Sequence, residues 1–291
     1  MKPPAFVYHA PTSVEEVVAI LAELGDEAKV LAGGQSLVPM LNMRLASPAA
    51  LVDLSRVAGL DDVEVADGHV RVEARVTHER LRRDEPAAAA LPLLREALDW
   101  VAHPVIRNRG TAVGSIVHAD PAAELPAVLG LADGDVELVS AAGTRHVAGA
   151  DYFAGPLESD TGPDELAVAV SFEALPARTG TAFTELARRH GDYAVAGVGV
   201  VVTLDADLRV ERAKAGFIGV AGIPVLLDVT GALAGQQHDA LAVADALEEA
   251  RRAIRPTDDI HASASYRRHV AGVLLGRALA TAAQKAAKET T

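Results

Sequence analysis

The stretch Lys29-Val30-Leu31-Ala32-Gly33-Gly34-Gln35-Ser36 places a glycine turn directly after a short apolar segment. The segment 29–32 is typical of a buried strand, and the two glycines end it. Because glycine has no Cβ, the backbone there can adopt conformations closed to other residues and bring successive N–H groups close to an anion. The pattern predicts either a phosphate-binding turn at 32–36 or a tight turn without a ligand, and by itself favours neither.

A second stretch of small residues, 111–115, has the sequence Thr-Ala-Val-Gly-Ser and follows the basic Arg107 and Arg109. Two such loops could clasp a pyrophosphate from opposite sides. Neither is a Rossmann fingerprint, the Gly-Val-Gly at 197–199 lacks the third glycine of one, and no P-loop lysine motif occurs. Binding of nicotinamide dinucleotides or nucleoside triphosphates by those folds is therefore disfavoured.

Hydrophobic periodicity around the two turns predicts strands and helices along nearly the whole chain. Thr12 and Glu15 form a capping box for a helix that begins at Val14 and ends at Gly25. In the second half strands precede helices, which favours an α+β arrangement, and the first domain is expected to end near Pro176. The other predicted elements are strands at 51–54, 70–74, 166–170, 195–204 and 210–219, a hairpin of 135–139 with 144–147, and helices at 91–102, 240–254 and 263–286.

Composition excludes several classes of function. The formal charge of −13 disfavours a nucleic-acid partner, since phosphate binding needs a basic surface. The absence of cysteine excludes disulfides, cysteine nucleophiles and any iron–sulfur cluster held by this chain. The ten histidines form no zinc motif, so no metal site is predicted. No apolar run approaches the ~20 residues of a membrane span and the start resembles no signal peptide, so we expect a cytoplasmic protein.

Four stretches resemble the FAD-binding medium subunit of the molybdenum hydroxylases, the group that contains aerobic carbon monoxide dehydrogenase, xanthine dehydrogenase, and nicotine and quinoline oxidoreductases. They are spread in order over nearly the whole chain, and together they are far more specific than either glycine loop. They are AGGQSLVPMLNMRL from Ala32, LPLLREAL from Leu91, VIRNRGTAVGSIVHADPAAELP from Val105 and RRHGDYAVAGV from Arg188.

The resemblance implies an α+β fold in two domains. Residues 1–176 would form a two-part FAD-binding domain of the vanillyl-alcohol-oxidase (PCMH) type, and 177–291 the smaller α+β carboxy-terminal domain of the family. It also implies that two loops hold the FAD pyrophosphate. These loops consist of Ala32, Gly33, Gly34, Gln35 and Ser36, and of Thr111, Ala112, Val113, Gly114 and Ser115.

Three further cofactor contacts follow from the resemblance. Glu124 stands where relatives place a cofactor-binding acid, Tyr193 where they pack an aromatic ring near the isoalloxazine, and Val101 where they place an aliphatic residue from the preceding helix. A ring stacked on a flavin buries apolar surface and screens the reactive face. A core tyrosine with a satisfied hydroxyl is the alternative for Tyr193. None of these residues is predicted to be catalytic.

Two departures from the family pattern and one histidine need separate treatment. Val113 replaces the usual middle glycine of the second loop, so the backbone there must suit a branched residue. Asp160 and Thr161 occupy a segment where relatives carry two leucines against the adenine, which leaves that contact open. His118 lies near the second loop, but we interpret it as a turn histidine rather than a covalent tether, and we expect non-covalent FAD.

The resemblance finally implies a division of labour between subunits. A molybdopterin-binding large subunit would oxidise the substrate, a 2Fe-2S small subunit would relay electrons, and FAD on this chain would pass them to an external acceptor, in a dimer of heterotrimers. Molybdopterin and the 2Fe-2S clusters would sit only on the partners. Two alternatives remain open: a self-sufficient FAD-dependent oxidoreductase of the same fold, and a flavin-free scaffold.

Overall fold

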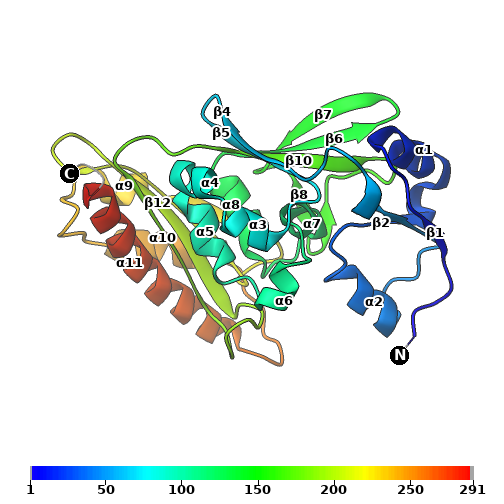
Figure 1. Ribbon diagram of the computed structural model, residues 1–291. Coiled ribbons are helices and arrows are strands. Elements are labelled where there is room, and N and C mark those ends of the chain that lie inside the picture. The colour runs from blue at the N-terminus through cyan, green and yellow to red at the C-terminus, as the bar shows by residue number, and fades with distance from the viewer. Residues whose placement is uncertain (1, 289–291) are drawn as a thin grey trace.

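The amino-terminal lobe is a small parallel sheet covered by one helix (Figure 1). Its helix α1 (Val14–Leu24) begins at the cap residue Ser13, whose hydroxyl accepts a hydrogen bond from the Glu16 amide, so the predicted cap at Thr12 lies one residue too early. Gly25, at φ 49°, ends α1 as predicted. The other elements of the lobe are β1 (Val7–His9), the 3-10 turn Gly25–Glu27, β2 (Ala28–Leu31), α2 (Leu37–Met43), β3 (Ala50–Asp53) and the 3-10 turn Leu54–Arg56, with the strands in the order β1-β3-β2.

A five-stranded antiparallel sheet follows in the computed structural model, which describes residues 2–288. Its central strand β10 (Leu166–Glu173) comes from far along the chain and pairs with β5 on one side and β6 on the other. The predicted hairpin at 135–147 is confirmed as β6 and β7. The order is β4 (Val63–Ala66), β5 (His69–Glu73), β10, β6 (Asp135–Ser140) and β7 (Gly143–Ala148), and a separate short hairpin joins β8 (Phe153–Gly155) to β9 (Glu158–Ser159).

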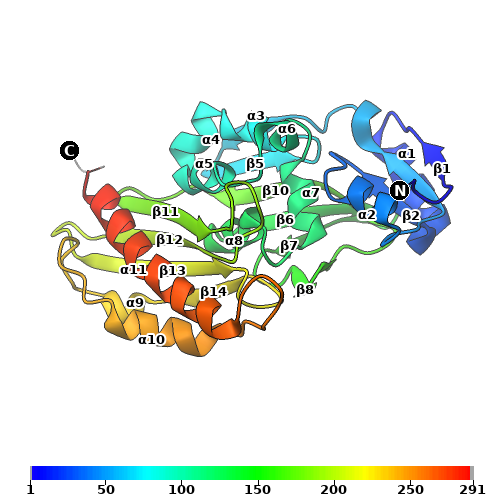
Figure 2. The ribbon, with the colours of Figure 1, turned by 90° about the horizontal axis from the view of Figure 1, so that it is seen from below.

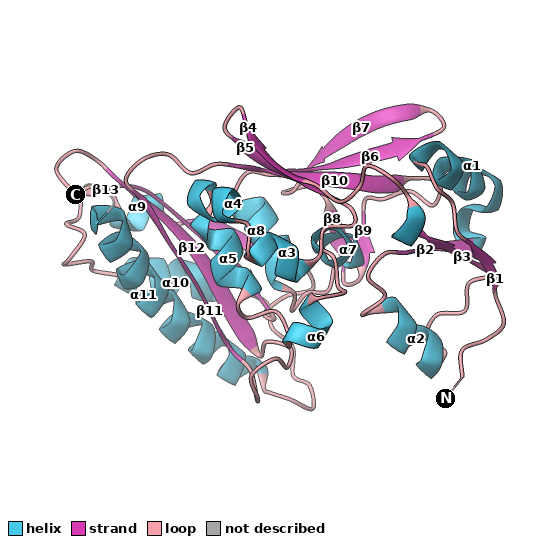
Figure 3. Ribbon diagram, in the orientation of Figure 1, coloured by secondary structure: helices cyan, strands magenta, loops and turns pink. Residues whose placement is uncertain are grey.

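Six short helices pack beneath that sheet and separate it from a second antiparallel sheet (Figures 1 and 3). Among them α5 ends at Leu98, so the helix predicted over 91–102 is too long. The helices are α3 (His78–Arg82), α4 (Glu85–Ala90), α5 (Pro92–Leu98), α6 (Pro104–Arg107), α7 (Ala112–His118) and α8 (Glu124–Leu131).

The carboxy-terminal half is a four-stranded sheet with helices packed on it, as predicted, and the α+β class is confirmed. Figure 2 shows α10 and α11 on its outer face, while α5 and α8 cover the inner face. Burial on both faces explains why the strand at 196–204 is almost continuously apolar. The elements are β11 (Thr179–Leu186), β12 (Ala196–Leu204), β13 (Val210–Ile218), β14 (Val225–Asp228), α9 (Thr230–Leu233), α10 (Ala244–Ala253) and α11 (Ala264–Lys288).

Close packing joins α8 to the second sheet. Cβ atoms built on Gly199 and Gly216 would lie 2.9 and 3.0 Å from Cδ1 of Leu131, so glycine at both positions leaves room for the leucine. Because side chains fill protein interiors at crystal-like density, such contacts fix the distance between the layers. The core that contains α5 and α8 accordingly extends to Phe183 and Ile218 of the second sheet.

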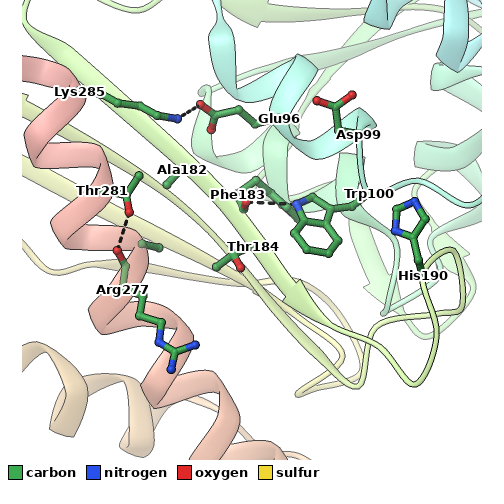
Figure 4. Close-up of a pocket in the computed structure, with 11 residues that line it drawn as sticks. Glu96, Asp99, Trp100, Ala182, Phe183, Thr184, His190, Arg277, Thr281 and Lys285 are labelled. Carbon is green, nitrogen blue, oxygen red and sulfur yellow. Dashed lines mark hydrogen bonds and ion pairs between the residues drawn. The ribbon is translucent and has the colours of Figure 1, made fainter. Parts of the chain in front are cut away.

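A cavity of about 470 Å³ lies where α5, β11 and α11 meet (Figure 4). The Trp100 indole donates a hydrogen bond to the carbonyl of Phe183 at 3.2 Å across it, and Lys285 pairs with Glu96. None of the residues predicted to hold FAD lines this cavity. Within 2–288, no helix is long and apolar enough to cross a membrane.

Candidate flavin-binding site

The fold brings the two small-residue segments of the sequence into contact. A Cβ built on Gly33 would lie 2.1 Å from the carbonyl oxygen of Arg109 and 2.7 Å from Cα of Gly110. One built on Gly114 would lie 3.9 Å from Cβ of Ala32. The first turn therefore packs against the backbone that leads into the second segment, and only glycine fits at position 33.

The turn at 33–36 contains backbone N–H groups that can donate hydrogen bonds to a ligand. Gly34 has φ 72°, a conformation that favours glycine. The amides of Gly34, Gln35 and Ser36 have no hydrogen-bond acceptor within the described range 2–288, whereas the carbonyl of Gly34 accepts the amide of Val38 at the start of α2. Successive unpaired N–H groups on a glycine turn form the kind of concavity that binds an anion.

The second segment is the start of a helix, so the expectation of a second loop is wrong. Thr111 caps α7, and its hydroxyl accepts the Gly114 amide at 3.1 Å. Val113 is 2 % exposed and lies in the helix, and helical backbone is a conformation that a branched residue can adopt. Hydrogen bonds from the amide of His78 to the Gly110 carbonyl and from the amide of Ala112 to the Val76 carbonyl hold the helix start in place.

A buried histidine that the sequence did not reveal stands behind this helix start. His78 is 6 % exposed, and neither ring nitrogen has a hydrogen-bond partner among the described residues. Burial, and then the positive charge of Arg107, lowers the pKa of His78 to about 4. The ring is therefore neutral at pH 7 and fills space beside Gly110, where a Cβ would lie 3.1 Å from its Nδ1.

Val101 lies in a turn after α5, not in a helix as predicted, and is 7 % exposed. The guanidinium of the buried Arg107 donates to the carbonyls of Val101 and Ala102 at 2.8 and 3.1 Å and to Glu79 at 3.2 Å. Ala102 has φ 40°, a backbone conformation that is strained for a residue with a Cβ. Hydrogen bonds from Arg82, Arg107 and Arg83 lower the pKa of Glu79 to about 2, so the anchor of this turn is ionised at pH 7.

Tyr193 is carried by the loop between β11 and β12, and its side chain is 69 % exposed. The alternative of a core tyrosine is therefore wrong. This loop packs against the turn that follows α5. Gly191 has φ 85°, and a Cβ built on it would lie 2.5 Å from Cε1 of His103. The rings of His103 and His190 contact each other edge to face, with their centroids 6.2 Å apart. Tyr193 also borders a cavity of about 850 Å³ lined by Asp120, Arg188 and Arg255 among others.

A group of carboxylates lies near Tyr193. Glu124 is the first residue of α8 and is half-buried; burial, and then the charge of Asp120, raises its pKa to about 7. Burial, and then the charge of Glu124, raises the pKa of Glu185 on β11 to about 9. Partial desolvation, followed by the charges of Asp120 and Glu124, raises the pKa of Tyr193. Sequence reasoning missed Glu185, because nothing in its own segment relates it to the first domain.

The polar side chains at 160–161 are already engaged within the chain. The carboxylate of Asp160 accepts a hydrogen bond from Arg145 at 2.6 Å, and the Thr161 hydroxyl lies 2.6 Å from that of Tyr152. A contact with an adenine ring, if this segment makes one, would therefore not come from free polar groups. His118 lies in the last turn of α7, at the opposite end from Thr111.

Comparison with known proteins identifies the family. The family model described as the FAD binding domain in molybdopterin dehydrogenase matches residues 4–175, and the CO dehydrogenase flavoprotein C-terminal domain matches 181–282. The chain belongs to the FAD-binding medium subunits of the molybdenum hydroxylases. This medium subunit is 40 % identical to the 6-hydroxypseudooxynicotine dehydrogenase complex subunit alpha of Paenarthrobacter nicotinovorans, over 98 % of its own length and 97 % of that protein.

Two further comparisons extend the likeness to the carbon monoxide dehydrogenases. The medium subunit is 36 % identical to the carbon monoxide dehydrogenase medium chain of Afipia carboxidovorans, with 98 % of its own length and 99 % of the relative covered. It matches a chain of reconstituted CO dehydrogenase from Oligotropha carboxidovorans with a TM-score of 0.92 at 35 % identity, covering 98 and 99 % of the two chains. The predicted family is thus confirmed.

Proposed function

We propose that this chain binds one FAD non-covalently and is the electron-exit subunit of a molybdenum-containing hydroxylase or dehydrogenase complex. The contact of Gly33 with the backbone at 109–110 is the observation that carries the proposal. It joins two segments, far apart in the sequence, that the family resemblance independently relates to one pyrophosphate. The first segment presents unpaired backbone amides, and the second presents small residues beside them at the start of α7, a combination that suits a diphosphate.

The residues present fit FAD. The amides of Gly34, Gln35 and Ser36, with the start of α7 at Thr111, would hold the diphosphate. The remaining residues of the two segments, Ala32, Gly33, Ala112, Val113, Gly114 and Ser115, would keep the backbone close and shape the space around it.

A second group of residues would surround the isoalloxazine ring. Val101 would present an aliphatic surface, Tyr193 an aromatic one, and Glu124 a carboxyl group. When bound, FAD would supply the redox chemistry, while these residues orient it and tune its surroundings. The exposure of Tyr193 supports a role in access to the ring, since an aromatic ring that is not used for packing within the chain is free to cover a cofactor.

The partners would be a molybdopterin-binding large subunit and a 2Fe-2S small subunit, in a dimer of heterotrimers. Two features support this assignment. The chain has no cysteine to hold a cluster, and it spans 97 to 99 % of relatives that are named as single subunits or chains of larger enzymes. The domain limits 1–176 and 177–291 belong to the same proposal, and the cytoplasmic location stays a prediction.

Two alternatives make different predictions. A self-sufficient flavoenzyme would turn over a substrate without partners, and a flavin-free scaffold would purify colourless. The chain matches named subunits of larger enzymes over nearly their whole length, which supports neither the self-sufficient flavoenzyme nor the scaffold.

The test is the absorbance spectrum of the purified chain, followed by acid precipitation. Flavin bands that pass to the supernatant would support non-covalent FAD, whereas colour kept in the pellet would mean a covalent link. A colourless chain that does not take up added FAD would contradict the proposal. Copurification with large and small subunits encoded nearby tests the assembly separately.

A further inference from the structure

A cavity of about 850 Å³ lies beside Tyr193, where loops from both halves of the chain meet. Its walls come from the loop before α8, the β8–β9 turn, the β11–β12 loop, the loop after β13, and the loop between α10 and α11. The volume is in the range of pockets that hold small molecules, and such pockets often lie between domains. None of the residues at 32–36 and 111–115 lines the cavity, so it is separate from the place proposed for the diphosphate.

The cavity is preformed, because hydrogen bonds fix its loops to one another. The guanidinium of the buried Arg267 donates to the carbonyls of Val195 and Gly219 at 2.5 and 2.9 Å. It also donates to the carboxylate of Asp259 at 2.6 Å and so joins three of the loops. The amide of Gly219 donates to the carbonyl of Pro121 at 2.8 Å, which adds the loop before α8. A ligand would therefore bind here without a large loss of chain entropy.

Two arginines of the lining have no carboxylate partner. Arg188 is exposed and forms no hydrogen bond or ion pair through its side chain with any residue in the range 2–288. Arg255 donates through Nη1 to the carbonyl of Ile254 at 2.9 Å and to that of Arg252, and these neutral acceptors leave its positive charge in place. An unpaired guanidinium can donate two parallel N–H groups to one oxyanion. Both side chains are therefore available to an anionic ligand.

The acidic groups of the lining do not neutralise these two arginines. Asp259 is bound to Arg267, and one oxygen of Asp120 accepts a backbone amide at 2.9 Å. Asp192 is exposed, and among the described residues neither it nor Asp120 forms an ion pair with an arginine. The lining also contains the exposed His261. Arginines and aspartates are thus equal in number here, on a chain in which 40 acidic residues outnumber 27 basic ones.

Tyr193 connects this cavity to the candidate flavin site. Its residue is 69 % exposed and borders the cavity. Its ring is the one that the proposed function places beside the isoalloxazine. A small molecule in the cavity would thus lie next to the same tyrosine as the reactive end of the cofactor.

We propose that this cavity binds the external electron acceptor, and that Arg188 and Arg255 select an acceptor that carries a negatively charged oxygen group. The inference rests on the proposed function, because an acceptor is needed only where a flavin is reduced. The chain has a formal charge of −13, so most of its surface repels an anion. Two unpaired guanidinium groups at one cavity are therefore what would attract an anion to this place.

The reaction at this site is a transfer of two electrons. They pass from the reduced flavin to the acceptor, which also takes up two protons from the flavin and the solvent. An indophenol or quinone acceptor leaves in its leuco or hydroquinone form, and the flavin is left oxidised. Arg188 and Arg255 take no part in the transfer itself. They are specificity residues, because they hold the anionic group of the acceptor.

Equilibrium dialysis of the full chain tests the binding without any turnover. The probes are dichlorophenolindophenol, whose phenol group is ionised at neutral pH, and menadione, an uncharged quinone. Arg188→Gln and Arg255→Gln should each raise the dissociation constant of the indophenol about fivefold, as expected for a partly exposed charge pair, and leave that of menadione unchanged. Arg251→Gln, the matched control, removes an exposed arginine that pairs with Glu248 on α10 outside the cavity and should change neither constant. An indophenol affinity that is unaltered in either cavity variant, or equally lowered in Arg251→Gln, would overturn the proposal.

Stopped-flow oxidation of the reduced, flavin-loaded chain tests the link to electron exit. The second-order rate constant with the indophenol should fall about fivefold in each cavity variant, and in the wild type it should fall as salt is added. The rate constant with menadione should stay the same. Equal losses with both acceptors would mean that the arginines act on the flavin rather than on the acceptor, and would overturn the proposed selection. A chain that binds no FAD would contradict the proposed function, and the dialysis would still decide whether the cavity takes an anion.

Discussion

The carbonyl oxygen of Arg109 lies 2.1 Å from the position that a Cβ on Gly33 would occupy. Backbone atoms cannot move aside as a flexible side chain can, so any residue other than glycine at position 33 must push the two segments apart. The close approach is what joins the strand-end turn to the start of α7, and it converts two ordinary sequence features into one candidate binding surface.

Gly33→Val should therefore abolish FAD retention. The added side chain should also cost about 1–3 kcal/mol of unfolding free energy, as overpacking usually does. The flavin-to-protein ratio from absorbance after gel filtration measures the first effect, and thermal unfolding the second. Gly231→Ala is the control, since a Cβ there would meet nothing within 4 Å. Full flavin occupancy in Gly33→Val would remove this turn from the site.

Thr111→Ala should weaken FAD binding and destabilise the chain by about 1 kcal/mol, the usual cost of a lost helix cap. The Thr111 hydroxyl accepts the Gly114 amide, and without it the start of α7 should loosen. Ser13→Ala removes a comparable cap from α1 and should lower stability alone. Flavin fluorescence titration distinguishes the two variants, and equal dissociation constants would show that the cap of α7 is structural only.

Tyr193→Ala should change the flavin spectrum or the rate of electron transfer to an acceptor, while the unfolding free energy stays within about 0.5 kcal/mol of the wild type. The reason is that the ring is 69 % exposed and contributes little to the core. Tyr266→Ala, which removes another exposed ring from α11, should change neither property. An unaltered spectrum together with an unaltered rate would exclude contact of Tyr193 with the flavin.

Arg107→Met should reduce FAD occupancy more than Arg82→Met does. Both arginines bind Glu79, but only Arg107 also holds the carbonyls of Val101 and Ala102. Removing a partner from this buried ion pair should cost about 3 kcal/mol for Arg107, which is the more deeply buried of the two. Flavin occupancy and urea unfolding measure these effects. The same occupancy in both variants would argue against a role for the 101–102 turn.

His78 should lower the unfolding free energy of the chain as the pH falls below about 6.5. Its pKa is about 4 in the folded chain and about 6.5 in the unfolded one, so between these values the unfolded chain binds more protons. Stability should thus fall as the pH drops from 6.5 towards 4, and His78→Leu should flatten that slope by up to one proton. Urea unfolding across this range tests it, with His69→Leu, at an exposed position, as the control. Parallel curves for wild type and His78→Leu would contradict the assignment.

Much of the local structure could be predicted because it depends on neighbouring residues. Apolar residues at helical spacing and a terminal glycine determine α1, and the alternation at 135–147 determines a hairpin. The predicted helix over 91–102 was too long because its apolar spacing continues past Leu98. The chain instead turns at 99–102, where Arg107 donates hydrogen bonds to the carbonyls of Val101 and Ala102. The strand at 179–186 was missed because both of its faces are buried, which hides the alternation.

The sequence by itself determined the family and the α+β class, and it predicted two segments that would bind a diphosphate, because glycine turns and short motifs are properties of adjacent residues. Only the tertiary structure decided that Gly33 packs against the backbone of Arg109 and that Tyr193 projects from the chain. These relationships depend on packing between residues distant in the chain, and on how much water that packing excludes. A local stretch of sequence determines neither the packing between distant segments nor the exclusion of water.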